Sequence, residues 1–199
     1  MVEEKIKDEA LDQEILKAAK QLFSKYGLKK TTMDDVAKAV GKGKSTLYYY
    51  YPGKTELFQS VINHEMNIAT RLIRIAVNKE KNASAKLASY LALRLKLKEE
   101  YNNLSKVFLE DLFDHYKEIY LLKQEFEATH LDFIKEIIKG GIQSSEFKAM
   151  KEEEISFFTL WVNAAVSGLE KPGQSSICIT STQNLKQIID YILFGIANS

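Results

Sequence analysis

The chain has few cysteines and prolines, and it lacks long apolar segments. Its 199 residues include one cysteine, Cys178, and only two prolines. A single cysteine cannot form a disulfide within the chain, which favours a reducing compartment, and we expect a cytoplasmic protein. No apolar run reaches about 18 residues, so no membrane-spanning helix is expected. The N-terminus is acidic and has no apolar segment typical of a signal peptide.

Arginine is absent before Arg71, and the formal net charge of the whole chain is only +1. The charge is nevertheless unevenly distributed. Residues 1–16 have a net charge of −4, and residues 55–199 a net charge of −2. Between them, residues 17–54 hold nine lysines against two aspartates, a net charge of +7. One strongly basic segment in an otherwise neutral chain is typical of phosphate binding.

Patterns typical of catalysis, metal binding or nucleotide binding are also missing. None of the three histidines (His64, His115 and His130) has a second histidine or a cysteine at a metal-binding spacing. Residues 43–45, Gly-Lys-Ser, resemble the end of a phosphate-binding loop, but Lys38 stands where that loop needs glycine. No nucleophile, base and acid can be grouped by spacing. We therefore expect no enzyme activity and no cofactor.

The apolar residues recur with helical spacing almost throughout, which predicts an all-α fold of about nine helices. Gly27 is expected to end a first helix that begins near Leu11, and two short helices follow. Six longer helices are expected after residue 53, in the following ranges: 54–78, 83–100, 102–114, 116–144, 151–169 and 181–197. The change of pattern predicts an N-terminal domain over residues 1–53 and a C-terminal domain over residues 54–199.

Residues 31–54 have the layout of a helix-turn-helix. Thr32 and Asp35 form a plausible capping pair for one short helix, and Gly41 ends that helix. Gly43 is expected to cap the next helix, whose residues Leu47 and Tyr51 should point inward. The remaining side chains are phosphate and base-edge donors in type, and we expect these to bind DNA: Thr32, Lys44, Ser45, Thr46, Tyr48, Tyr49, Tyr50 and Lys54.

The alternative is that the run of four tyrosines, residues 48–51, is only aromatic core or surface. Successive side chains of a helix lie about 100° apart, so one helix cannot bury all four. At least two must face outward. Because no arginine is available for bidentate contact with guanine, base recognition should be modest and DNA shape should contribute to specificity.

These residues resemble the tetracycline-repressor (TetR/AcrR) family of bacterial regulators. The resemblance rests on Gly41-x-x-Lys44-x-Thr46-Leu47-Tyr48-x-Tyr50-aromatic-x-x-Lys54, after Thr-Thr-x-x-x-Val-Ala and before Leu-Phe. It implies an N-terminal helix-turn-helix, a C-terminal domain that binds a small effector, and a homodimer, and it places DNA contacts on the eight residues given above. The chain departs from the usual pattern at Lys42, Gly43, Tyr51 and Gly53.

The resemblance also implies an effector pocket among the helices of the C-terminal domain. Aromatic side chains there would suit an apolar or flat ligand. The candidates are Tyr90, Phe108, Phe113, Tyr120 and Trp161. Each of these is an ordinary core residue in the alternative interpretation.

The last two expected helices, 151–169 and 181–197, are apolar on more than one face. A helix on the surface of a monomer needs one apolar stripe, so the second face indicates a further partner. The family uses these helices in a four-helix dimer interface. The expected interface residues are Phe158, Trp161, Val162, Ala165, Ile188, Ile189, Ile192 and Ile196. The alternative is a helix pair buried deeply within one chain.

Together, the patterns and what the resemblance implies predict a homodimeric transcriptional repressor that a small molecule releases from a palindromic double-stranded DNA operator. A regulator without a small ligand is a second interpretation. A helical adaptor that uses the basic segment to bind another acidic partner is a third, from a different class of protein.

Overall fold

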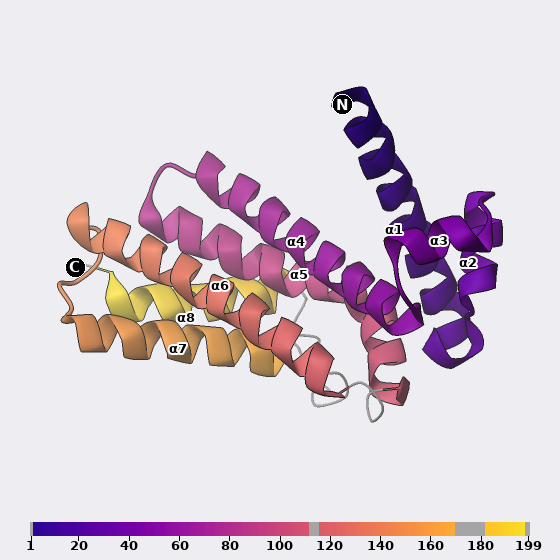
Figure 1. The fold of residues 1–199 in the computed structure, drawn as a ribbon. Coiled ribbons are helices and arrows are strands. Elements are labelled where there is room, and N and C mark those ends of the chain that lie inside the picture. The colour runs from indigo at the N-terminus through magenta and orange to yellow at the C-terminus, as the bar shows by residue number, and fades with distance from the viewer. Residues whose placement is uncertain (1, 112–115, 170–181, 198–199) are drawn as a thin grey trace. The chain divides into compact units, whose positions relative to one another are not determined.

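The computed structural model describes residues 2–111, 116–169 and 182–197, and the side chains of residues 9–97, 120–167 and 186–197. These residues form eight helices and confirm the all-α prediction (Figure 1). Their bounds are α1 Val2–Lys30, α2 Met33–Val40, α3 Lys44–Tyr50, α4 Lys54–Lys79, α5 Ala83–Asp111, α6 Tyr116–Gln143, α7 Glu152–Leu169 and α8 Thr182–Ile196. None of the described helices is both long enough and apolar enough to cross a membrane.

The helix count differs from the expected nine in one place. Helices were predicted separately over 83–100 and 102–114, but α5 runs without a break from Ala83 to Asp111. Neither glycine nor proline occurs in that range, so nothing in the backbone chemistry ends the helix near residue 101.

Gly27 was predicted to end the first helix; it breaks the helical backbone of α1, and one more turn follows it. The residue has φ 82° and ψ 163°, a backbone conformation that residues with a Cβ rarely adopt. Thr31 then closes the break, because its hydroxyl donates to the Gly27 carbonyl at 2.8 Å. The interruption redirects the chain toward α2.

The chain forms two compact units whose boundaries cut across the long helices. Unit 1 consists of residues 1–68 and 101–123, and unit 2 of residues 69–100 and 124–199. Helices α4, α5 and α6 therefore contribute to both units. The division of function at residue 54 stays a prediction.

Unit 1 has a core made by the inward faces of α1 to α4. The Phe23 and Phe58 rings meet edge to face at 5.2 Å between centroids. Lys20 on α1 and the buried Glu65 on α4 form an ion pair at 2.5 Å. The buried apolar residues are Ile15, Leu16, Ala19, Phe23, Leu28, Met33, Val36, Ala37, Leu47, Tyr51, Leu57, Phe58, Val61 and Ile62.

Unit 2 is closed at one end by the segment that follows α6. Phe147 is buried and pairs in an isolated antiparallel bridge with Ala197 at the end of α8. The Glu146 carboxylate accepts from the backbone N–H groups of Ala83 and Ser84, at 2.7 and 2.9 Å, and so caps α5. Burial opposes ionisation of Glu146, but these hydrogen bonds outweigh it and hold its pKa below the ordinary value.

The residues exposed on α7 and α8 are not the ones that were expected to form the dimer interface. Val162, Ile192 and Ile196 were assigned to the dimer interface, but they are buried within the single chain. Phe158, Ala165, Ile188 and Ile189 are half-buried, and Trp161 is exposed. The large exposed apolar side chains of these two helices are Phe157, Leu160, Trp161, Tyr191 and Phe194.

We expect Gly141→Ala to destabilise the protein, because its Cβ would lie 2.8 Å from the Ala83 Cβ and overlap the Phe147 ring. Overpacking of this kind costs about 1–3 kcal/mol, or roughly 2–12 °C in Tm. Gly140→Ala is the matched control, since a Cβ there meets nothing within 4 Å and should stabilise α6 by about 0.5–1 kcal/mol. Thermal unfolding of both variants measures the difference, and equal Tm values would contradict the close packing.

Candidate functional site

Helix α2 begins with the predicted capping pair. Thr32 has an extended backbone, and its hydroxyl oxygen accepts from the Asp35 N–H at 3.2 Å. Asp35 Oδ2 in turn accepts from the Thr32 N–H and hydroxyl, at 2.9 and 2.7 Å. Hydrogen bonds from Thr32 lower the pKa of Asp35. The Thr32 hydroxyl proton is therefore already bonded within the cap, which adds a structural role to its expected DNA contact.

The turn between α2 and α3 contains two glycines. Gly41 adopts the left-handed conformation, with φ 68° and ψ 30°, and its N–H donates back to the last turn of α2. Gly43 precedes α3 with an extended backbone and makes no side-chain cap. Both positions were predicted from the sequence and are confirmed.

The predicted split of the four tyrosines is refined by the structure. Tyr51 is buried, and its hydroxyl donates to Asp12 Oδ1; burial first, and then this hydrogen bond, raises the Tyr51 pKa. Tyr48 is 45% exposed and Tyr49 is 81% exposed. Tyr50 is half-buried and packs against the core of unit 1, with its ring edge to face against Tyr49 at 5.5 Å. Tyr48 and Tyr49 are thus the outward pair.

The other predicted DNA contacts lie at the start of α3 and of α4. Lys44 and Ser45 are exposed, and Thr46 is half-buried. Lys54 Nζ donates to the carbonyls of Leu28 and Lys29, at 2.8 and 3.4 Å. Lys54 therefore ties the start of α4 to the end of α1, and a phosphate contact would be a second role for it.

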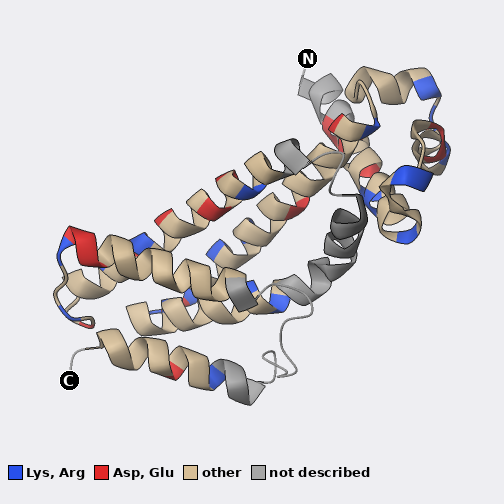
Figure 2. Ribbon diagram, turned by 90° about the horizontal axis from the view of Figure 1, so that it is seen from below, with Lys and Arg blue, Asp and Glu red and all other residues tan. Residues whose placement is uncertain are grey.

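Lysines recur along α1 to α3 (Figure 2), but several already have partners. Lys20 pairs with Glu65, and Lys38 pairs with Asp34 at 2.8 Å. Lys42 and Lys44, on either side of Gly43, are exposed and have no ion-pair partner among the described residues. Lys42, in the turn directly before Gly43, was not among the expected contacts.

Unit 2 has a buried polar cluster that sequence reasoning missed, apart from Tyr90. Arg94 Nη1 donates to the Tyr90 hydroxyl at 2.9 Å and to Asn163 Oδ1 at 3.3 Å. Arg94 Nη2 lies 3.4 Å from Glu127 Oε1, and the Tyr90 hydroxyl lies 3.2 Å from His130 Nδ1. We call these five residues the polar cluster. It joins α5, α6 and α7, and burial, then the Arg94 charge, lowers the pKa of His130 to about 3.

The expected effector residues are not gathered in one place by the described structure. Tyr90 is buried in the polar cluster, while Tyr120 and Trp161 are exposed. The Phe108 side chain and the whole of Phe113 lie outside the described residues.

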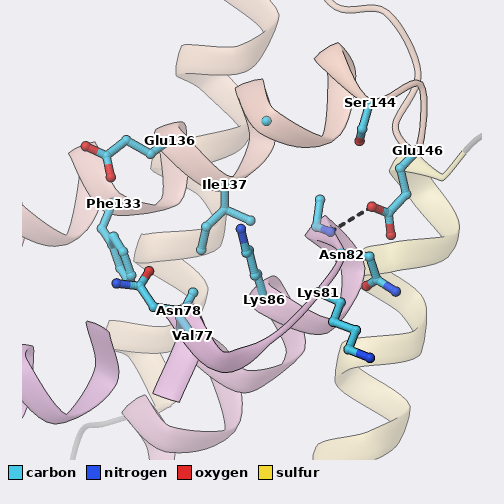
Figure 3. A pocket seen from close by; sticks show the side chains of 12 residues that line it. Val77, Asn78, Lys81, Asn82, Lys86, Phe133, Glu136, Ile137, Ser144 and Glu146 are labelled. Carbon is cyan, nitrogen blue, oxygen red and sulfur yellow. Dashed lines mark hydrogen bonds between the residues drawn. The ribbon is translucent and has the colours of Figure 1, made fainter. Parts of the chain in front are cut away.

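A pocket of about 310 Å³ lies elsewhere in unit 2, where α4 ends, α5 begins and α6 ends (Figure 3). Lys81, Lys86, Glu136 and Glu146 supply charges of both signs to its wall. Tyr90, Tyr120 and Trp161 are not among its lining residues. Among the described side chains, no group of three or more histidine, cysteine, aspartate or glutamate residues could hold a metal ion.

Comparison with known proteins gives a consistent result. Residues 15–61 match the family model for bacterial regulatory proteins of the tetR family. The HTH-type transcriptional regulator YhgD of Bacillus subtilis, itself uncharacterized, is 28% identical over 146 residues, covering 73% of this chain and 76% of that protein. RutR of Escherichia coli K12, another HTH-type transcriptional regulator, is 24% identical over 152 residues, covering 75% and 69%.

Solved structures agree with these relatives. A transcriptional regulator from Cytophaga hutchinsonii superposes with a TM-score of 0.69 at 27% identity, covering 92% of this chain and 97% of that chain. A TetR transcription regulator from Haloarcula marismortui has the same fold, with a TM-score of 0.75 at 17% identity, covering 96% and 100%.

The helix-turn-helix geometry and these relatives define a DNA-binding transcriptional regulator. Its capped α2, its glycine turn and its exposed α3 are the parts that such a regulator presents to DNA. Residues 15–61 place the DNA-binding part of the chain in the TetR family, and the chain as a whole is similar to regulators of this kind.

Proposed function

We propose that this regulator is a homodimeric repressor, working in the cytoplasm, that leaves a palindromic operator when a small effector binds. The observation that carries the DNA-binding part is the exposed start of α3, where Lys42 and Lys44 flank Gly43 without ion-pair partners among the described residues. Lysine ammonium groups there can neutralise phosphates and position α3 in the major groove.

The proposed DNA contacts combine charge with hydroxyl donors. Ser45, Tyr48 and Tyr49 are exposed and offer hydroxyl groups on the surface of α3. Thr46 and Tyr50 are half-buried, so they can reach DNA only along their exposed edges. Since no arginine is available, phosphate contact should dominate affinity, and DNA shape should supply part of the specificity.

The proposed dimer rests on the exposed apolar side chains of α7 and α8. Phe157, Leu160 and Trp161 follow one another at helical spacing on α7, and Tyr191 and Phe194 do so on α8. The two helices lie side by side in Figures 1 and 2. A large exposed apolar patch of this kind usually marks an interaction surface. A second copy would bring a second recognition helix to the other half of a palindrome.

Release by an effector requires a difference in affinity between two states. The effector must bind the DNA-incompetent arrangement of the dimer more tightly than the competent one. Unit 2 is where we place effector binding, because it holds the buried polar cluster as well as the apolar core.

Lysine substitutions at the start of α3 test the DNA-binding proposal. We expect Lys42→Ala and Lys44→Ala each to weaken binding to a duplex selected from a random pool by about tenfold. The slope of log affinity against log salt should become shallower by roughly one for each. Gel shifts at several salt concentrations measure both effects. Lys148→Ala, at an exposed position of unit 2, is the control and should bind unchanged.

Lys54→Ala tests in the same experiment whether Lys54 has a structural role in addition to a DNA contact. Because Lys54 Nζ holds two carbonyls at the end of α1, its loss should lower Tm as well as DNA affinity. Lys44→Ala should lower DNA affinity alone. Unchanged affinity and salt slope in both the Lys42 and the Lys44 variants would contradict the proposed interface.

A further inference from the structure

Two buried hydrogen-bonding groups of unit 2 have no partner among the described residues. They are His130 Nε2 and Thr159 Oγ1, on side chains whose residues are 1% and 4% exposed. The Thr159 hydroxyl does not even bond back to a carbonyl of its own helix. Because an unpaired buried polar group is unfavourable, most such groups are paired in native proteins. Two of them in adjacent helices need a specific explanation.

The register of α6 against α7 brings the two groups to the same level. Two side-chain pairs define this register: Asn163 Nδ2 with Glu127 Oε2 at 2.5 Å, and Lys135 Nζ with Ser156 Oγ at 3.5 Å. Partner numbers rise along α6 as they fall along α7, so the helices are antiparallel. Thr159 lies between the two α7 members of these pairs, and His130 lies between the two α6 members.

The hydrogen bonds of the polar cluster assign the proton on His130. Arg94 donates to the Tyr90 hydroxyl, and the Nε2–H tautomer of His130 allows the tyrosine to donate its own proton to Nδ1. His130 is neutral near pH 7, because its pKa is lowered to about 3. A neutral imidazole that accepts at Nδ1 carries its proton at Nε2. Nε2 is therefore a donor, at the end of a chain of hydrogen bonds that starts from a guanidinium.

The surroundings of His130 are aromatic. The Phe126 ring meets the imidazole edge to face at 4.2 Å between centroids, and the Tyr90 ring contacts both His130 and Phe133, at centroid distances of 5.7 and 5.8 Å. A ligand at this level would meet two hydrogen-bonding groups and apolar walls. Because Glu127 already pairs with the guanidinium behind Tyr90, the donor at Nε2, rather than a net positive charge, selects the ligand atom, which must be a hydrogen-bond acceptor.

We propose that His130 Nε2 and Thr159 Oγ1 together bind the carbonyl-type oxygen, carboxylate or amide, of a small effector with an aromatic or apolar body. This rests on the proposed function, in which unit 2 binds the effector. It deepens that function by naming the chemistry of the ligand and the two groups that recognise it.

Histidine resonances test the proposal directly, because the chain has only three histidines. The probes are benzoate and benzamide, which present the oxygen, and benzylamine, which does not. In full-length protein labelled with ¹⁵N-histidine, we expect His130 to be the Nε2–H tautomer at pH 7. Benzoate or benzamide should move its Nε2 resonance saturably, and benzylamine should leave it unchanged. His64, on α4, is the internal control and should not respond.

Thr159→Val gives a second readout that a merely structural hydroxyl would not give. The change keeps the shape and removes an unpaired buried group, so Tm should stay the same or rise. The dissociation constant of the responding probe should nevertheless rise by about tenfold. Ser156→Val, an exposed position one turn earlier on α7, is the control.

The outcomes separate this inference from the proposed function. No movement of the His130 resonance with either oxygen probe up to about 10 mM would overturn it, since weaker binding is not specific recognition. A fall in Tm of several degrees in Thr159→Val would also overturn it, because the hydroxyl would then be paired structurally. The same protein preparations are tested by gel shift. If the His130 resonance does not respond but the protein binds DNA, the ligand inference is wrong and the regulator assignment stands. If the His130 resonance responds but the protein does not bind DNA, only the regulator function is refuted.

Discussion

Replacing Arg94 with methionine should lower the Tm of the protein by roughly 6–12 °C, because it leaves the Glu127 carboxylate without its cation. The Arg94 side chain is 2% exposed, so water cannot take over its interactions. Removal of one partner from a buried ion pair costs about 3–5 kcal/mol. We expect the lower end of that range, about 3 kcal/mol.

The remaining hydrogen-bond partners of Glu127 explain why the expected loss of stability lies at the lower end of this range. Its carboxylate also accepts from Asn163 Nδ2 at 2.5 Å and from Ser167 Oγ at 3.1 Å, and those bonds persist in the variant. The Tyr90 hydroxyl loses its donor, and the Phe126 ring loses a guanidinium that lies 5.0 Å from its centroid. Both losses add to the effect without exposing a further charge.

Arg74→Met is the matched control, since Arg74 also lies over an aromatic ring, that of Phe133 at 4.8 Å, but is exposed. An exposed cation–π contact contributes about 0.5–1 kcal/mol, so its Tm should fall by only a few degrees. The double variant Arg94→Met with Glu127→Leu should recover part of the loss, because no charge is then left unpaired. Thermal unfolding at one fixed protein concentration compares all three. Equal shifts for Arg94→Met and Arg74→Met would contradict the buried pair.

The DNA-binding head was predictable because its signals are local. The Thr32–Asp35 cap spans four residues, and the glycines at positions 41 and 43 act on the helix next to them. The four-residue spacing of Leu47 and Tyr51 was enough to place both side chains inside. Each of these features depends on neighbours in sequence, so composition and spacing carry the information.

The polar cluster was not predictable because its members are far apart in the chain. Arg94 finds Glu127 33 residues later and Asn163 69 residues later. The available signal was that Arg94 occupies an apolar stripe with Leu87, Tyr90 and Leu91, where a charge requires a buried partner. That signal indicates a pairing but cannot identify the partner. The hydrogen bonds of Lys54 were equally unpredictable, because no residue near Lys54 in the sequence indicates that it bonds to carbonyls of α1.

The sequence also showed that α7 and α8 have two apolar faces without showing which one points inward. Ile192 looked suitable for an interface but is part of the core of unit 2, so its substitution would report on folding. Phe157 and Phe194 lie on the other face and are 71% and 86% exposed. Only the packing of unit 2 distinguishes the two faces, because both satisfy the same helical periodicity.

Phe194→Glu should convert the proposed dimer into a monomer at micromolar concentration and sharply reduce operator binding. The side chain is 86% exposed in the single chain, so the change should not disturb folding. In the proposed dimer it would place a carboxylate within an apolar interface, where burial without a partner is strongly unfavourable. Loss of the second recognition helix removes the bivalent contribution, and operator affinity should fall by about 10²–10⁴. Sedimentation velocity and gel shifts measure the two effects.

Leu72→Glu provides the control that separates a specific interface from general surface apolarity. Leu72 is also an exposed apolar residue, at 42%, but it lies on α4, outside the stripe formed by α7 and α8. Its variant should sediment as the unmodified chain does and keep its operator affinity. The interface proposal is wrong if the unmodified chain is a monomer, or if Phe194→Glu remains dimeric. A loss of dimer in both variants would instead indicate that the contact surface extends to α4. If only Phe194→Glu dissociates, the exposed face of α7 and α8 joins the two chains, and the buried face with Val162 and Ile192 serves each chain alone.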